Sequence, residues 1–131
     1  MGAQGEDLAV RLLKQEGFII LGRNVEVGRY ELDIIAREDD TIAFVEVKTR
    51  RDDGYAAPEA NITPKKQRHI RSAAHRWLSD NEPEDVYFRF DVVTVVLPES
   101  GEPELLLIRD AFPDVRPVKA SVSPRARMRR R

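Results

Sequence analysis

The sequence predicts an α/β fold with helices and strands in the order αβββαββ. Residues 5–16 and 64–80 repeat apolar side chains at helical spacing, whereas residues 30–36 and 41–49 alternate them as strands do. The chain has 131 residues, 41% of them hydrophobic, which suits one domain with one core. We therefore expect a single α/β domain.

The N-terminal part is predicted to form a helix and a short strand. The helix covers residues 5–16, and its apolar positions share one face: Leu8, Ala9, Leu12 and Leu13. Gly17 favours the end of this helix. Residues 18–21 form a continuous apolar run, which predicts a short buried strand. Turn-favouring residues then interrupt the chain at Gly22, Asn24 and Gly28.

The next two strands are predicted to pair as an antiparallel hairpin. Residues 30–36 and 41–49 are separated by the turn-forming residues 38–40. Alternation along the first strand predicts that Asp33 shares a face with Ile35, opposite Leu32, Ile34 and Ala36.

The C-terminal half is predicted to contribute one helix and two strands. Residues 50–63 lack periodicity and predict a loop, and Thr63 is a favourable N-cap for a helix over 64–80. Residues 86–97 are rich in β-branched and aromatic side chains, and residues 104–108 form a last strand. A charged residue in the first of these strands, Asp91, is predicted to have a structural hydrogen-bonding role.

Composition excludes several classes of protein. The absence of cysteine excludes disulfides and thiolate zinc sites. No apolar run approaches the ~20 residues of a membrane span, and no secretory segment is recognisable, so we expect a cytoplasmic protein. Residues 113–131 hold seven Lys/Arg and one Asp, about +6, so a net charge of −1 leaves about −7 on residues 1–112. This basic tail is predicted to be disordered, and it either binds phosphate or is simply solvated.

Three charged residues lie within apolar strands, where charge is costly unless it is paired or binds a metal. Asp33 lies in the first strand of the predicted hairpin, and Glu46 and Lys48 lie in the second. Glu46 and Lys48 share a face because they are two residues apart. The hairpin places Asp33 roughly opposite Glu46.

This pattern suits the hydrolysis of a phosphodiester. Two carboxylates and the backbone carbonyl of Val47 are oxygen ligands of the kind that Mg²⁺ or Mn²⁺ prefers. A bound cation polarises phosphate and activates water, while Lys48 can stabilise developing charge. The alternative is that Asp33, Glu46 and Lys48 form an ordinary salt-bridged face of an antiparallel sheet.

The chain resembles the YraN-like family of predicted bacterial endonucleases, related to archaeal Holliday-junction resolvases within the restriction-endonuclease-like, or PD-(D/E)xK, superfamily. The matching stretches cover about residues 2–95 in order: GAQGE at 2–6, ELDIIA at 31–36, FVEVKTR at 44–50, Lys66, Trp77-Leu78 and RFDVV at 89–93. The chain departs from the family pattern at Tyr30, where glycine is usual, and at residues 52–56.

The resemblance implies a restriction-endonuclease-like αβββαβ core, with a mixed central sheet flanked by helices over residues 1–112. It implies metal ligands at Asp33 and Glu46, Lys48 as the catalytic lysine and Glu6 as an auxiliary acid.

Three further residues are predicted to contact nucleic acid. Lys66 and Gln67 flank the inward face at the start of the 64–80 helix, where they could reach a phosphate near the metal site. Arg50 follows Lys48 by two residues. The alternative for Lys66 is a lysine that extends along the core surface toward water.

The sequence thus predicts a Mg²⁺-dependent endonuclease that hydrolyses DNA, with branched or recombination intermediates as the substrates that the resemblance suggests. The alternative is a non-catalytic nucleic-acid-binding or adaptor domain with the same fold, and a third option is an exonuclease. A homodimer is compatible with symmetric cutting of two strands.

Overall fold

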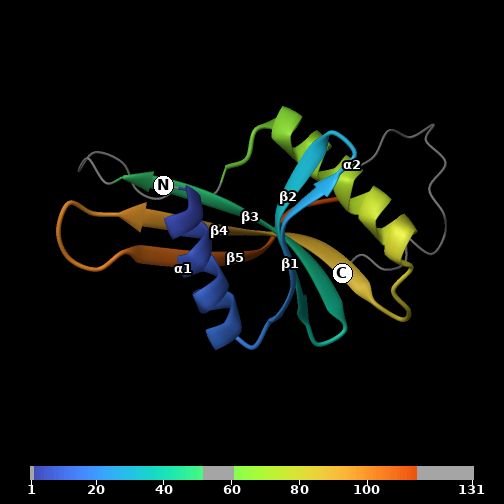
Figure 1. The fold of residues 1–131 in the computed structure, drawn as a ribbon, viewed down its shortest axis with the longest axis horizontal. Coiled ribbons are helices and arrows are strands. Elements are labelled where there is room, and N and C mark those ends of the chain that lie inside the picture. Colours follow the sequence, from blue (N-terminus) through green and yellow to red (C-terminus); the bar gives the residue numbers. More distant parts are fainter. Residues whose placement is uncertain (1, 52–60, 115–131) are drawn as a thin grey trace.

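The computed structural model describes residues 2–51 and 61–114. Its elements follow the predicted order (Figure 1): α1 (Gly2–Gln15), β1 (Ile19–Val27), β2 (Tyr30–Glu38), β3 (Thr41–Arg51), α2 (Pro64–Asn81), β4 (Tyr87–Leu97) and β5 (Glu104–Phe112). Residues 52–60 of the predicted loop, including the departure at 52–56, lie outside the described residues, as does most of the predicted tail, residues 115–131.

The strands of the described chain form one sheet in sequence order, β1-β2-β3-β4-β5. Neighbouring strands are antiparallel except β3 and β4, which run parallel. Helix α2 lies in the connection between β3 and β4, because parallel neighbours need a crossover that returns the chain to the same end of the sheet. The predicted mixed sheet and αβββαβ core are confirmed.

The two helices cover opposite faces of the sheet (Figure 1). Ala9 and Leu13 of α1 pack in one apolar cluster with Val45 of β3. Ile70 of α2 packs in a second cluster with Phe44, the neighbour of Val45 in the chain. Consecutive strand residues point to opposite faces, so α1 and α2 form the outer layers of a three-layer domain.

Strand β1 is longer and more exposed than the buried strand predicted at 18–21. Ile19 is 65% exposed and Leu21 46%, so the prediction of a short buried strand was wrong. β1 is an edge strand, and pairing with β2 continues beyond Gly22 through a shift in register. Asn24 adopts a φ of 49°, which asparagine tolerates, so neither residue ends the strand.

The side-chain alternation predicted for β2 fails at Asp33. Leu32 packs in the α2-side cluster with Ile35, whereas Ile34 and Ala36 pack in the α1-side cluster. The common face predicted for Leu32, Ile34 and Ala36 was therefore wrong. Backbone pairing with β3 stops at Ile34, which leaves the preceding part of β2 free to twist toward α2.

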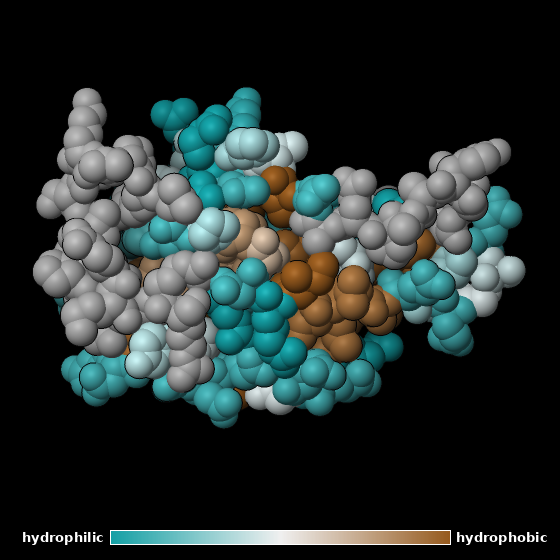
Figure 2. All heavy atoms as spheres, turned by 180° about the vertical axis from the view of Figure 1, so that it is seen from behind, coloured by the Kyte–Doolittle hydropathy of each residue, from teal (hydrophilic) through white to brown (hydrophobic). Residues whose placement is uncertain are grey.

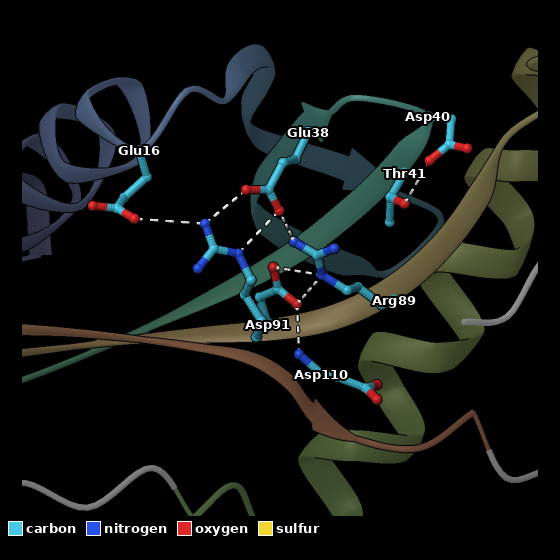
Figure 3. Close-up of polar contacts among 8 residues, drawn as sticks. Glu16, Glu38, Asp40, Thr41, Arg89, Asp91 and Asp110 are labelled. Carbon is cyan, nitrogen blue, oxygen red and sulfur yellow. Dashed lines mark hydrogen bonds and ion pairs between the residues drawn. The ribbon is translucent and has the colours of Figure 1, made fainter.

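A charged network joins the end of β2 to β4, to β5 and to Glu16, the residue that follows α1 (Figure 3). Arg89 Nε donates to Asp91 Oδ1 over 2.9 Å, and Arg109 Nη2 donates to Glu38 Oε2 over 2.6 Å. Arg89 Nη2 also donates to Glu38, and the backbone N–H of Asp110 donates to Asp91. Asp91 is fully buried, so its predicted structural hydrogen-bonding role is confirmed.

The described surface is mainly polar, although Figure 2 shows apolar side chains gathered over one area of the face seen from behind. The most exposed large apolar side chains belong to the two edge strands: Ile19, Leu21, Leu105 and Leu106. Within residues 2–51 and 61–114, neither helix combines the length and apolar character needed to span a bilayer.

Candidate functional site

The centre of the site is the point where β2 and β3 separate. Their backbone pairing runs from Glu38 opposite Thr41 to Ile34 opposite Val45 and then stops. The next pair in this register would be Asp33 and Glu46. Here Asp33 Oδ2 instead accepts a hydrogen bond of 2.9 Å from the Val47 N–H. The Asp33 carboxylate thus replaces a backbone carbonyl and is fixed beside β3.

Glu46 is a largely buried carboxyl group next to Asp33. Its side chain is 11% exposed. Burial, and then the negative charge of Asp33, raise the pKa of Glu46 to about 8. Lys66 opposes this shift, because its Nζ lies 3.4 Å from Glu46 Oε2. Two acidic groups are therefore held together at an electrostatic cost that a cation would relieve.

Lys48 shares the α2-side face of β3 with Glu46, as predicted. Phe44 belongs to the α2-side cluster, whereas Val45 and Val47 pack on the α1 side, so the even-numbered positions face α2. Lys48 Nζ donates a hydrogen bond of 2.7 Å to the backbone carbonyl of Asn61. This contact ties the end of β3 to the segment that leads into α2.

The first turn of α2 brings the other predicted contacts toward β3. The Thr63 side chain accepts a hydrogen bond of 3.1 Å from the Lys66 N–H, as the predicted N-cap should. Gln67 Nε2 donates to the Ile62 carbonyl over 2.9 Å. Gln67 Oε1 accepts a hydrogen bond from Arg71, so Gln67 fastens the start of the helix. Its predicted contact with nucleic acid stays a prediction.

Helix α1 approaches the same end of β3 through Gly5. A Cβ added at Gly5 would lie 2.0 Å from Thr49 Oγ1, so only glycine permits this contact. The next residue, Glu6, has a side chain 17% exposed, and its carboxylate lies 3.8 Å from the Arg23 guanidinium. Among the described residues, no three acidic, histidine or cysteine side chains gather into a metal-binding group. The role of Glu6 as an auxiliary acid therefore stays a prediction.

The donor set fits a hard divalent cation. Asp33 and Glu46 offer carboxylate oxygens, and Val47 offers a backbone carbonyl. Mg²⁺ typically binds one or two carboxylates and keeps several waters, so a third acidic side chain is not required. Arg50 lies two residues beyond Lys48 on the same strand and is half-buried. The same edge of the site can therefore offer cationic groups to an anion.

Two contacts of the site were not predicted from the sequence. The acceptor of Lys48 is the main-chain carbonyl of Asn61, which no residue type encodes. The approach of Lys66 to Glu46 depends on how α2 packs on the sheet. The placement of Lys66 at the helix start was the sequence feature that could have indicated it.

The fold and site define a small α/β domain with a paired-carboxylate, lysine-flanked centre. The chain belongs to the uncharacterised protein family UPF0102, whose model matches residues 5–95, from α1 through most of β4. All of the acidic and lysine residues of the site lie within this range.

Several UPF0102 proteins are similar to this chain. The protein from Geotalea uraniireducens is 46% identical over 112 residues, which cover 86% of this chain and 88% of the relative. The protein from Rhodococcus jostii is 45% identical over 112 residues, 86% of this chain and 95% of the relative. The protein from Geotalea daltonii is 44% identical over 112 residues, 86% and 88% of the two chains.

Proposed function

We propose that this protein is a divalent-cation-dependent endonuclease that hydrolyses DNA phosphodiester bonds. The observation that supports it most is the partly buried acidic pair at the point where β2 and β3 separate. The Val47 N–H fixes Asp33, and the pKa of Glu46 is raised to about 8. Two lysines flank the pair. Perturbed carboxyl groups of this kind concentrate at functional sites.

Each residue has a chemical role in this proposal. Asp33, Glu46 and the Val47 carbonyl would hold Mg²⁺ or Mn²⁺, which would polarise the phosphate and lower the pKa of a water molecule. Lys48 contacts a neutral carbonyl at 2.7 Å, and a phosphate oxygen could replace that acceptor. A charged donor then stabilises the negative charge that develops during hydrolysis.

The surface beside the acidic pair suits a phosphate backbone. Lys65, Lys66 and Arg68 at the start of α2 are exposed, although residues 1–112 are acidic overall. Local cations that neutralise phosphates supply most of the non-specific affinity for nucleic acid. Branched DNA is the substrate that the family resemblance suggests.

A second candidate is a nucleic-acid-binding domain without catalysis. The ion pair between Lys66 and Glu46 favours this candidate, because an ammonium group lies against the carboxylate where the proposal needs a metal ion. Titration calorimetry distinguishes the two. The nuclease binds Mg²⁺ and loses this binding in Asp33→Asn, whereas the binding domain takes up no cation even with DNA present.

The decisive assay is cleavage. Supercoiled plasmid, linear duplex and a four-way junction would be incubated with Mg²⁺ or Mn²⁺ and wild-type protein, Asp33→Asn or Lys48→Ala. Glu84→Gln and Lys14→Ala are matched controls, because both residues are exposed and distant in sequence from the pair. We expect wild type and the controls to cut DNA. The two site variants should cleave it roughly 100-fold more slowly or worse. Equal cutting by all proteins, or none, would refute the nuclease; cutting of open ends alone would indicate an exonuclease.

A further inference from the structure

Two rings stack on the surface between the β1–β2 hairpin and α2. The phenol of Tyr30 and the imidazole of His69 have centroids 4.4 Å apart and planes within 19° of parallel. Tyr30 is the first residue of β2, and His69 lies in the second turn of α2. Both side chains are partly exposed, so the pair lies at the rim of the α2-side core rather than inside it.

The stack lies close to the acidic pair along both of its elements. Tyr30 precedes Asp33 by three residues of β2, about 10 Å of strand. His69 follows Lys66 by three residues of α2, about 4.5 Å of helix. Since Lys66 Nζ is 3.4 Å from Glu46 Oε2, the stack and the acidic pair border the same part of the molecule. The twist of β2 at Asp33 brings Tyr30 to this side.

One cationic group lies over the Tyr30 ring, and two more lie close to His69 in the sequence. The Arg29 guanidinium carbon is 6.0 Å from the centroid of the Tyr30 ring, within the range of a cation–π contact. Lys65 and Arg68 of α2 are exposed near His69 in the sequence. Partly exposed aromatic rings with cations close by match two features of a nucleotide at once, its base and its phosphate.

We infer that Tyr30 and His69 form a stacking platform for an unpaired base beside the acidic pair. The inference rests on the proposed function and narrows its substrate to DNA that carries unpaired nucleotides next to the cleaved phosphate. Bases within a duplex stack on one another and offer no free face to a protein ring, whereas unpaired bases stack readily on aromatic side chains.

Cleavage kinetics test the inference. Two duplexes of equal length would be compared, one fully paired and one with an unpaired segment, using wild type, Tyr30→Ala, His69→Ala and Tyr30→Phe. Tyr87→Ala is the matched control, since Tyr87 is also partly exposed but lies at the start of β4. Tyr30→Ala and His69→Ala should raise KM roughly tenfold on the unpaired substrate alone, the order expected from the loss of one stacked base. Tyr30→Phe and Tyr87→Ala should behave as wild type. Equal losses on both substrates, or no loss, would overturn the inference.

A binding measurement separates this inference from the proposed function. A single-stranded oligonucleotide with 2-aminopurine, a fluorescent base quenched by stacking, would be titrated with each protein in Ca²⁺. Wild type and Tyr30→Phe should quench the probe, while Tyr30→Ala and His69→Ala should not. Quenching by a wild type that cuts no DNA would refute the nuclease and keep the platform. Cleavage of DNA without Tyr30-dependent quenching would refute the platform and keep the nuclease.

Discussion

The Asp33 carboxylate accepts a 2.9 Å hydrogen bond from the Val47 N–H at the position where β2 and β3 cease to pair. One carboxylate oxygen thus completes a sheet in which no backbone carbonyl is available. Burial raises the pKa of Glu46, and the negative charge of Asp33 raises it further, so Asp33 has both a structural and an electrostatic role.

Replacing Asp33 separates these two roles. Asp33→Ala leaves the Val47 N–H without its acceptor and should lower the free energy of unfolding by about 1–3 kcal/mol. Asp33→Asn keeps an oxygen that can accept the hydrogen bond from the Val47 N–H, so it should lose less stability than Asp33→Ala. Urea denaturation at pH 7 measures both. Asp80→Ala, at an exposed position, should change stability by less than about 0.5 kcal/mol. Equal destabilisation by Asp33→Ala and Asp33→Asn would show that the hydrogen bond to Val47 is not the source of the loss.

The pKa of Glu46 makes stability depend on pH. It is about 8 in the folded protein against an ordinary 4.5, so between these values the folded chain holds a proton that the unfolded chain has released. The contribution of Glu46 is therefore fully present below about pH 4.5 and is lost as the pH rises toward 8. Glu46→Gln should flatten this decline in metal-free buffer and exceed wild-type stability at pH 8. Glu84→Gln, at an exposed position, should leave the decline unchanged. Parallel curves of stability against pH for wild type and Glu46→Gln would contradict a raised pKa of Glu46.

Gly5 allows α1 to pack closely against β3. Alanine favours a helix over glycine by ~1 kcal/mol, but its Cβ would lie 2.0 Å from Thr49 Oγ1. The clash should dominate, so Gly5→Ala should destabilise the protein by about 1–3 kcal/mol. Thermal unfolding should show partial recovery in Gly5→Ala with Thr49→Ala, which removes the nearest atom. Gln4→Ala, on the exposed side of the helix, should be neutral. A stabilised Gly5→Ala would mean that helix propensity prevails over the contact.

The Arg89–Asp91 pair should be the most sensitive ion pair in the described chain. Asp91 is 0% exposed, so Arg89→Ala would leave a buried carboxylate without its guanidinium, a change that costs about 3–5 kcal/mol. Arg109→Ala removes a 40% exposed partner of Glu38 and should cost ~1 kcal/mol or less. Chemical denaturation compares the two variants directly. Similar losses of stability in the two variants would show that the burial of Asp91 does not decide which ion pair of the network matters most.

The hairpin at 38–41 explains why much of the site could be predicted from the sequence. Its turn fixes the register of Ile34 opposite Val45, and period-2 alternation then places Glu46 and Lys48 on one face. Helix α2 was equally predictable, because Thr63 caps it and its apolar positions repeat at helical spacing.

Other features depend on tertiary packing, which sequence patterns do not encode. Gly22 and Asn24 favour turns, yet pairing with β2 keeps both within β1. Leu32 lies on the opposite face of the sheet from Ile34 and Ala36 because β2 and β3 separate at this point. The 3.4 Å approach of Lys66 to Glu46 requires α2 to dock on one particular part of the sheet.

The central claim is that Asp33 and Glu46 jointly bind a divalent cation. Anomalous diffraction from a crystal soaked in Mn²⁺ near pH 8 tests it most directly. We expect one strong peak about 2 Å from oxygens of both carboxylates and of the Val47 carbonyl, with Lys66 displaced from Glu46. An Asp33→Asn crystal treated in the same way should lack this peak. Wild-type crystals with Lys66 still on Glu46 and no manganese between the two carboxylates would contradict the account.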